Sequence, residues 1–217
     1  RYPSQWGGDP QADWGGLAGN LRSGLSWGLT GAPYYATDVG GFYGDQRDPL
    51  LYARWIQAAV FSAHMRLHGI GAREPWSYGE AVEKIAMDAL DLRYRLLPYL
   101  QHAIAQSAAT GLPVQRAMVL ACPQDRAAWA FEDQFFFGDD LLVAPCLRPD
   151  GLVTVYLPAG EWVRFPGREP FAGGRCHALT LAATELAVFA RRHSRIPLGP
   201  AAAPLQRQVE TESTWIA

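Results

Sequence analysis

Three polar side chains, each beside a short glycine-rich stretch, are the residues of this sequence that could do chemistry. Asp9 closes the stretch Trp6-Gly7-Gly8-Asp9, Asp38 opens the loop Val39-Gly40-Gly41-Phe42, and His68 follows a short apolar segment. Carboxylic acids and imidazoles transfer protons, and glycines let a ligand approach the backbone closely. The stretch Trp6-Gly7-Gly8-Asp9 would direct the Asp9 carboxylic acid toward the ring of a bound ligand.

Each of these residues also has a simpler interpretation. Asp9 could close an ordinary glycine turn, Asp38 could cap a turn or a helix, and His68 could be a hydrogen-bonded core histidine. The position of each residue relative to the surrounding elements decides between the two interpretations.

Composition indicates an ordinary globular protein. The 217 residues are 49% hydrophobic and 18% charged, with a net charge of −2 and eight tryptophans. These rings suit a core, and they also suit the apolar faces of sugars. The basic cluster Arg191, Arg192, His193 and Arg195 has no accompanying basic stripe, so it predicts a solvated surface and no nucleic-acid partner.

Several function classes lack their sequence signals. Cys122, Cys146 and Cys176 are an odd number at wide spacing, which argues against a disulfide framework or a zinc site. No apolar run reaches the ~20 residues of a membrane span, and no phosphate-binding loop, dinucleotide fingerprint or serine-hydrolase elbow is present. The start at Arg1 shows neither an initiator Met nor a signal-peptide pattern, which predicts an earlier segment and slightly favours the cytoplasm over secretion.

The first half of the chain alternates predicted helices and strands, and each strand ends in a polar side chain and a glycine loop. This order is typical of βα units, whose active residues gather at the carboxyl ends of parallel strands. The expected elements are a helix at 17–29 with a buried leucine stripe, a strand at 33–37, a helix from Pro49, a strand at 64–67, and a long helix kinked at Pro98 and capped by Gly111.

The pattern changes after Pro113 to short strands separated by Pro, Gly or Asp, which predicts an antiparallel β-sandwich over 113–199. Turns are expected at 160–162 and 173–174, and the pair Asp139 and Asp140 is best explained as a turn that starts a strand. Residues 200–217 are predicted to be a linker or tail. The expected strands are 114–121, 141–144, 153–157, 161–165, 177–181 and 186–190.

Six motifs in order resemble glycoside hydrolase family 31, most closely its bacterial α-xylosidase and α-glucosidase branch. The resemblance covers roughly 1–199 and implies the C-terminal βα units of a (β/α)₈ barrel at 1–112, followed by a β-sandwich at 113–199. The motifs are Gln5-Trp6-Gly7-Gly8-Asp9, Thr37-Asp38-Val39-Gly40-Gly41-Phe42, Arg66-Leu67-His68-Gly69, Arg95-Leu96-Leu97-Pro98-Tyr99-Leu100, Gly138-Asp139-Asp140-Leu141-Leu142-Val143-Ala144-Pro145 and Val155-Tyr156-Leu157-Pro158-Ala159-Gly160-Glu161-Trp162.

The resemblance implies a retaining, exo-acting α-glycosidase that uses two aspartates and neither a metal nor another cofactor. Asp9 matches the general acid/base, and a desolvating setting beside Trp6 would favour its protonated form. Asp38 matches a buried carboxylate that supports the first sugar subsite, with Arg66 as its charge partner. The remaining matches are Trp6 and Phe42 as aromatic walls of that subsite and His68 as a ligand of a sugar hydroxyl.

The family's nucleophilic aspartate would lie upstream of Arg1, so the expected partners are an α-linked oligosaccharide and the remainder of the barrel. The chain alone is expected to be inactive. A non-catalytic carbohydrate-binding or interaction fragment, with the sandwich as its working part, is the alternative, and an orphan product of a disrupted gene is a third. The choice between α-xyloside and α-glucoside and the question of a homo-oligomer stay open.

Overall fold

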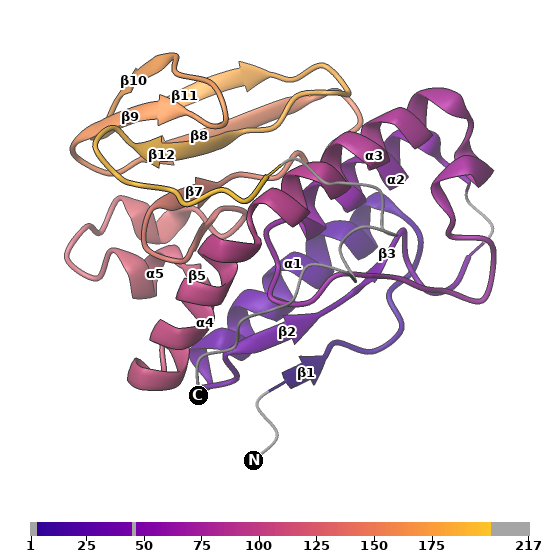
Figure 1. Ribbon diagram of the computed structural model, residues 1–217, viewed down its shortest axis with the longest axis horizontal. Coiled ribbons are helices and arrows are strands. Elements are labelled where there is room, and N and C mark those ends of the chain that lie inside the picture. Colours follow the sequence, from indigo (N-terminus) through magenta and orange to yellow (C-terminus); the bar gives the residue numbers. More distant parts are fainter. Residues whose placement is uncertain (1–3, 45–46, 201–217) are drawn as a thin grey trace.

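The computed structural model describes residues 4–44 and 47–200. Parallel strands lie on one side of a layer of helices, and antiparallel strands lie on the other (Figure 1). The predicted tail at 200–217 falls outside the described residues except for Pro200. Within the described ranges, no helix combines the length and apolarity needed to cross a membrane.

Two pairs of short parallel strands carry the glycine loops. Strand β1 (Ser4–Trp6) pairs with β2 (Tyr34–Ala36), and β3 (Asp38–Val39) pairs with β4 (Arg66–Leu67). Parallel neighbours need a crossover connection, and helices supply it here, so the predicted βα units are confirmed. The predicted strand at 33–37 was too long, because the pairing changes partner at Thr37 and Asp38 lies inside β3.

Helices α1 (Trp14–Leu29) and α2 (Pro49–Ala59) follow the first and third strands. The α1 helix begins three residues before the predicted start because the Asp13 carboxylate accepts an amide hydrogen bond from its first turn at 2.6 Å. Asp48 caps α2 in the same way. The predicted leucine stripe of α1 was wrong at its last member, since Leu29 is 52% exposed.

The long helix predicted after residue 77 is two helices in the structure. A 3-10 turn, η1 (Pro75–Tyr78), comes first. Helix α3 (Glu80–Arg95) then ends just before Leu96, and α4 (Leu97–Thr110) begins just after it. Pro98 lacks an amide hydrogen and its ring clashes with the carbonyl four residues earlier, so the break falls where the predicted kink is. Gly111 caps α4 in the left-handed conformation, as predicted.

The antiparallel strands form a six-stranded sheet, in the order β10-β9-β12-β7-β6-β5, and a two-stranded sheet of β8 and β11. The bounds are β5 Gln115–Ala117, β6 Phe135–Phe137, β7 Leu141–Val143, β8 Leu152–Leu157, β9 Glu161–Arg164, β10 Pro170–Ala172, β11 Arg175–Thr180 and β12 Val188–Arg191, with helix α5 Met118–Ala121 and the 3-10 turn η2 Ala128–Ala130 between β5 and β6.

Two predictions for this region were wrong in detail, and two strands were missed. The expected strand at 114–121 is the short strand β5 followed by α5, and β6 and β10 were not predicted at all. The expected turn at 160–162 is shorter, because β9 already begins at Glu161. A run of three phenylalanines has no alternation to identify it as a strand, and β10 begins with a proline at a sheet edge.

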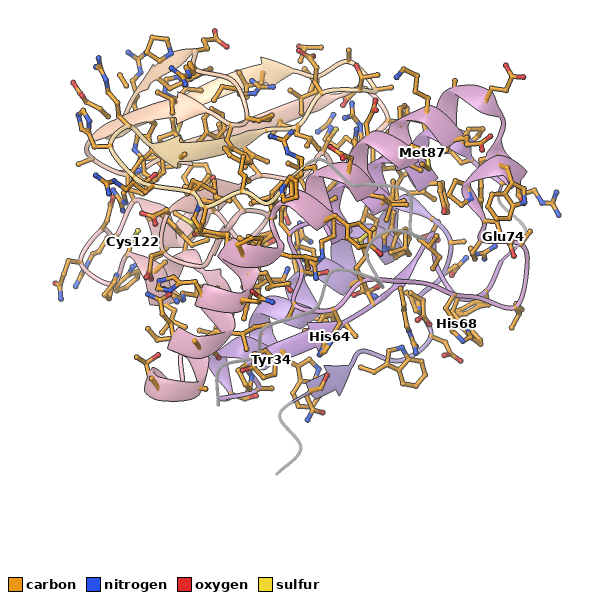
Figure 2. All side chains as sticks on the ribbon, in the orientation of Figure 1. Tyr34, His64, His68, Glu74, Met87 and Cys122 are labelled. Carbon is orange, nitrogen blue, oxygen red and sulfur yellow. The ribbon has the colours of Figure 1, made fainter. Side chains whose placement is uncertain are left out.

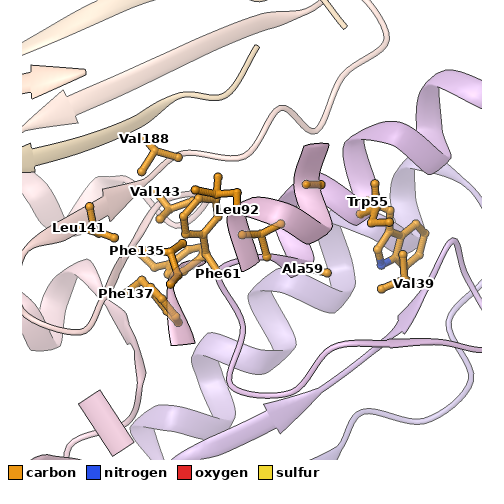
Figure 3. Packing of buried hydrophobic residues seen from close by; sticks show 14 of the residues in the cluster. Val39, Trp55, Ala59, Phe61, Leu92, Phe135, Phe137, Leu141, Val143 and Val188 are labelled. Atoms are coloured by element: carbon orange, nitrogen blue, oxygen red, sulfur yellow. The ribbon is translucent and has the colours of Figure 1, made fainter. Parts of the chain in front are cut away.

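Two apolar clusters hold the layers together. The larger joins the helices to the six-stranded sheet, with Phe61 and Leu92 against Phe135, Phe137 and Val188 (Figure 3). The second lies between the six-stranded sheet and β8 and contains Trp162 and Val155. The sandwich and the barrel part therefore share a continuous core.

Asp139 and Asp140 lie in the turn that starts β7, as predicted, and the first of these acids is paired with a buried arginine. Arg116 is 6% exposed and donates to the Asp139 carboxylate, which also accepts from Gln106. Partial burial opposes the ionised form of Asp139, but these hydrogen bonds outweigh it and hold its pKa below the ordinary value. The ion pair is therefore complete at neutral pH.

We expect Asp139→Asn to reduce the free energy of unfolding at pH 7 by up to about 1 kcal/mol, the range for partly exposed pairs. A depressed pKa stabilises the fold above the unfolded value of about 3.9, and this stabilisation is lost as pH falls through the folded pKa. The difference between wild type and variant should thus be smaller at pH 3 than at pH 7 in urea unfolding, and it should shrink further as the pH falls. Asp88→Asn, at the exposed ion pair with Lys84, is the control. An equal difference at pH 7 and pH 3 would contradict the assignment.

Candidate active site

The loops that follow β1, β3 and β4 are joined by main-chain hydrogen bonds. The Phe42 amide donates to the Pro10 carbonyl at 2.7 Å, and the Ala12 amide donates to the Tyr43 carbonyl at 2.8 Å. On the other side, the Ile70 amide donates to the Phe42 carbonyl at 2.9 Å. The three glycine-rich motifs therefore form one continuous rim at the carboxyl ends of the parallel strands.

Asp9 lies three residues beyond β1 and directly before the Pro10 carbonyl that binds the Phe42 loop. Its side chain is exposed, and Trp6 is 49% exposed. The desolvating setting predicted for this acid is thus not made by the described residues. Gly8 has a φ of +87°, a conformation that side chains with a Cβ resist, and it turns the chain toward the rim.

Asp38 is a fully buried carboxylate with one free oxygen. Its Oδ1 accepts a hydrogen bond from Arg66 Nε at 2.6 Å, while Oδ2 has no partner among the described residues. The same guanidinium lies 5.5 Å from the Trp6 ring centroid, within cation–π range. Arg66 is thus the charge partner of Asp38, as the sequence predicted, and its contact with the exposed indole of Trp6 was not predicted.

Phe42 and His68 face each other across the second and third loops. Their ring centroids are 5.5 Å apart with planes tilted by 49°. His68 is exposed in the loop after β4 (Figure 2), and Phe42 is half-buried. The pair leaves an imidazole accessible beside an aromatic ring, which suits a ligand that has both hydroxyl groups and an apolar face.

Arg73 is a further residue of this region that the sequence analysis missed. Its side chain is 7% exposed, and Nε donates to the Gly41 carbonyl at 2.6 Å, which ties the third loop to the second. The Tyr52 hydroxyl donates to the Arg73 carbonyl at 2.6 Å, and burial raises the pKa of Tyr52, so it stays a donor. No spacing rule could have identified Arg73, because its partner is a backbone carbonyl far away in the sequence.

A cavity of about 430 Å³ lies away from the rim, between α3 and the sandwich. Both acidic and basic side chains line it, among them Asp88, Arg95, Arg164 and Glu169. None of the predicted site residues lines this cavity, and the loops that gather Asp9, Asp38 and His68 are the better candidate for chemistry.

Comparisons with known proteins agree with the fold. A family model described as the glycosyl hydrolases family 31 TIM-barrel domain matches residues 1–103, and one described as the family 31 C-terminal domain matches residues 111–196. Similar curated proteins include an alpha-xylosidase of Emericella nidulans, 35% identical, and alpha-glucosidase 2 of Bacillus thermoamyloliquefaciens, 34% identical. These matches cover 91% and 92% of this chain and 26% of each relative.

Solved structures give the same result. A GH31 alpha-xylosidase from a soil metagenome, complexed with xylose, aligns with a TM-score of 0.84 at 33% identity over 88% of this chain and 32% of that one. A GH31 dextranase of Flavobacterium johnsoniae, complexed with glucose, aligns with a TM-score of 0.85 at 33% identity over 91% and 26%. The chain thus spans about a quarter of the length of the curated relatives named above. With two models of one family matching consecutive parts of the sequence, this chain belongs to glycosyl hydrolase family 31.

Proposed function

We propose that this chain supplies the acid/base half of the active site of a retaining, exo-acting α-glycosidase. The observation that carries the proposal is the hydrogen-bonded rim, which gathers the Asp9, Asp38 and His68 loops at the carboxyl ends of parallel strands. That edge is where active residues of (β/α)₈ barrels collect. The division into a barrel part at 1–112 and a sandwich at 113–199 belongs to the same proposal.

Each site residue has one role in this scheme. Asp9 protonates the leaving glycosidic oxygen and then removes a proton from the attacking water. Asp38, held by Arg66, offers its free oxygen as support for the first sugar subsite. Trp6 and Phe42 form aromatic walls of that subsite, and His68 binds a sugar hydroxyl.

The nucleophile comes from outside residues 1–217 in this proposal. A retaining mechanism needs a second carboxylate about 5–5.5 Å from the acid. The Asp38 carboxylate is fully buried and engaged by Arg66, so it is poorly placed to attack a sugar. The exposure of Asp9 and Trp6 also fits a pocket whose other wall is another part of the barrel.

The test is hydrolysis of 4-nitrophenyl α-xyloside and α-glucoside by a longer protein containing this chain and by residues 1–217 alone. We expect turnover by the former and none above the buffer rate by the latter. The names of the relatives do not choose between the two sugars, so both are assayed. Turnover by residues 1–217 alone would refute the external nucleophile, and inactivity of the longer protein on both substrates would refute the glycosidase assignment.

A further inference from the structure

Tyr35 packs directly against the loop that carries Asp9. It lies in β2, opposite Gln5 of β1, and is 6% exposed. A Cβ added at Gly7 would lie 1.7 Å from the Tyr35 hydroxyl oxygen, so the phenol occupies the space that a side chain there would need. The contact lies two residues before Asp9.

The opposite side of the Tyr35 ring meets helix α1. A Cβ added at Gly24 would lie 2.6 Å from Tyr35 Cδ1, closer than real Cβ atoms come, and 3.0 Å from Cε1. Both approaches require glycine for the same reason, since the ring fills the gap between the helix and the loop. Gly19, in the same helix, has no atom within 4 Å of its added Cβ.

The Tyr35 hydroxyl acts as a neutral spacer. Burial raises its pKa, and nearby Asp38 adds to that effect, whereas the Ser23 hydroxyl opposes it. The oxygen makes no hydrogen bond of ordinary geometry within the described part of the chain. Since no strong hydrogen bond holds the hydroxyl, packing contacts hold the Tyr35 ring in place. In a close-packed interior, a displacement of one group is passed to its neighbours through such contacts.

We propose that Tyr35 is a positioning residue, which transmits the position of helix α1 to the Gly7-Gly8-Asp9 loop and so sets where the acid meets the glycosidic oxygen. The inference rests on the proposed function, because the position of Asp9 matters only if Asp9 is the acid that protonates the glycosidic oxygen. It differs from a purely structural role in one respect: displacing the ring should harm proton transfer more than folding or sugar binding.

The experiment uses Gly24→Ala in an active longer protein that contains this chain. The new methyl group pushes the Tyr35 ring toward Gly7 without touching the acid loop. A misplacement of about 1 Å can cost about 10²-fold in rate, so we expect kcat/KM on a methyl glycoside to fall about 10- to 100-fold. Loss on a dinitrophenyl glycoside, whose leaving group needs no protonation, should be much smaller. KM should change little.

Gly19→Ala is the matched control, and we expect both rates to stay at wild-type values. Equal losses on the two substrates, or no loss, would overturn the inference. If Gly24→Ala fails to fold, Tyr35→Phe decides, because it keeps the ring and removes the oxygen that touches Gly7. A selective loss on the methyl glycoside supports the inference, and an unchanged ratio of the two rates refutes it. Inactive wild-type protein refutes the proposed function instead.

Discussion

Replacing Asp9 with alanine in an active longer protein should lower kcat/KM on methyl or sugar leaving groups by about 10²- to 10⁴-fold, the usual contribution of general acid–base catalysis. A dinitrophenyl leaving group departs without a proton, so the first step on that substrate should be spared. Initial rates on the two substrate classes, measured in parallel, give the comparison.

Asp88→Ala is the control for this prediction, because Asp88 is an exposed acid of α3 that pairs with Lys84. We expect it to leave both rates unchanged. Equal retention of activity by the Asp9 variant on both leaving groups would remove the role assigned to Asp9, even if the absolute loss were large.

Arg54→Met should destabilise the junction between the barrel part and the sandwich by about 2–4 kcal/mol. Arg54 is 3% exposed and donates to the carbonyls of Leu181, Ala182 and Glu185, each at 2.9 Å, as well as to Gln57. A buried group left without its partner costs about 1–3 kcal/mol. Of the three acceptor residues, only Leu181 is buried, and water can bind the carbonyls of exposed Ala182 and Glu185. The expected loss is therefore smaller than three times the cost of one unpaired buried group.

Denaturant unfolding measures this loss, and proteolysis within 181–185 reports where it occurs. Arg54→Lys should recover little, because one ammonium group cannot reproduce the planar fork that reaches several carbonyls. The control is Arg126→Met, an exposed arginine over the Trp129 ring, for which we expect a loss of less than about 1 kcal/mol. A smaller effect at Arg54 than at Arg126 would contradict the proposed clamp.

The sequence predicted the strands and loops that carry the candidate site residues better than it predicted the strands of the sandwich. Asp9, Asp38 and His68 each lie in or just after a short strand, and glycines next to them indicate turns, so their approximate places follow from local patterns alone. The gathering of the three loops follows from parallel pairing, which helices between strands predict. Boundaries were less certain, as the early start of α1 at its Asp13 cap shows.

What could not be predicted depends on contacts between distant residues. Arg54 and Arg73 bind backbone carbonyls far away in the sequence, and such acceptors carry no residue-type signal. The exposure of Asp9 depends on which segments surround the loop, not on the loop itself. Strand β6 is a buried run of three phenylalanines, and a buried run has no polar alternation to mark its period.

The most direct test of the central claim is the product that the Asp9→Ala variant makes with azide. On a dinitrophenyl α-glycoside, the variant should accumulate a covalent glycosyl-enzyme, because no base remains to activate water. Azide needs no base, so we predict faster turnover and a glycosyl azide with the α configuration, identified by proton NMR. A β-glycosyl azide, or no acceleration and no adduct, would contradict Asp9 as the acid/base of a retaining α-glycosidase.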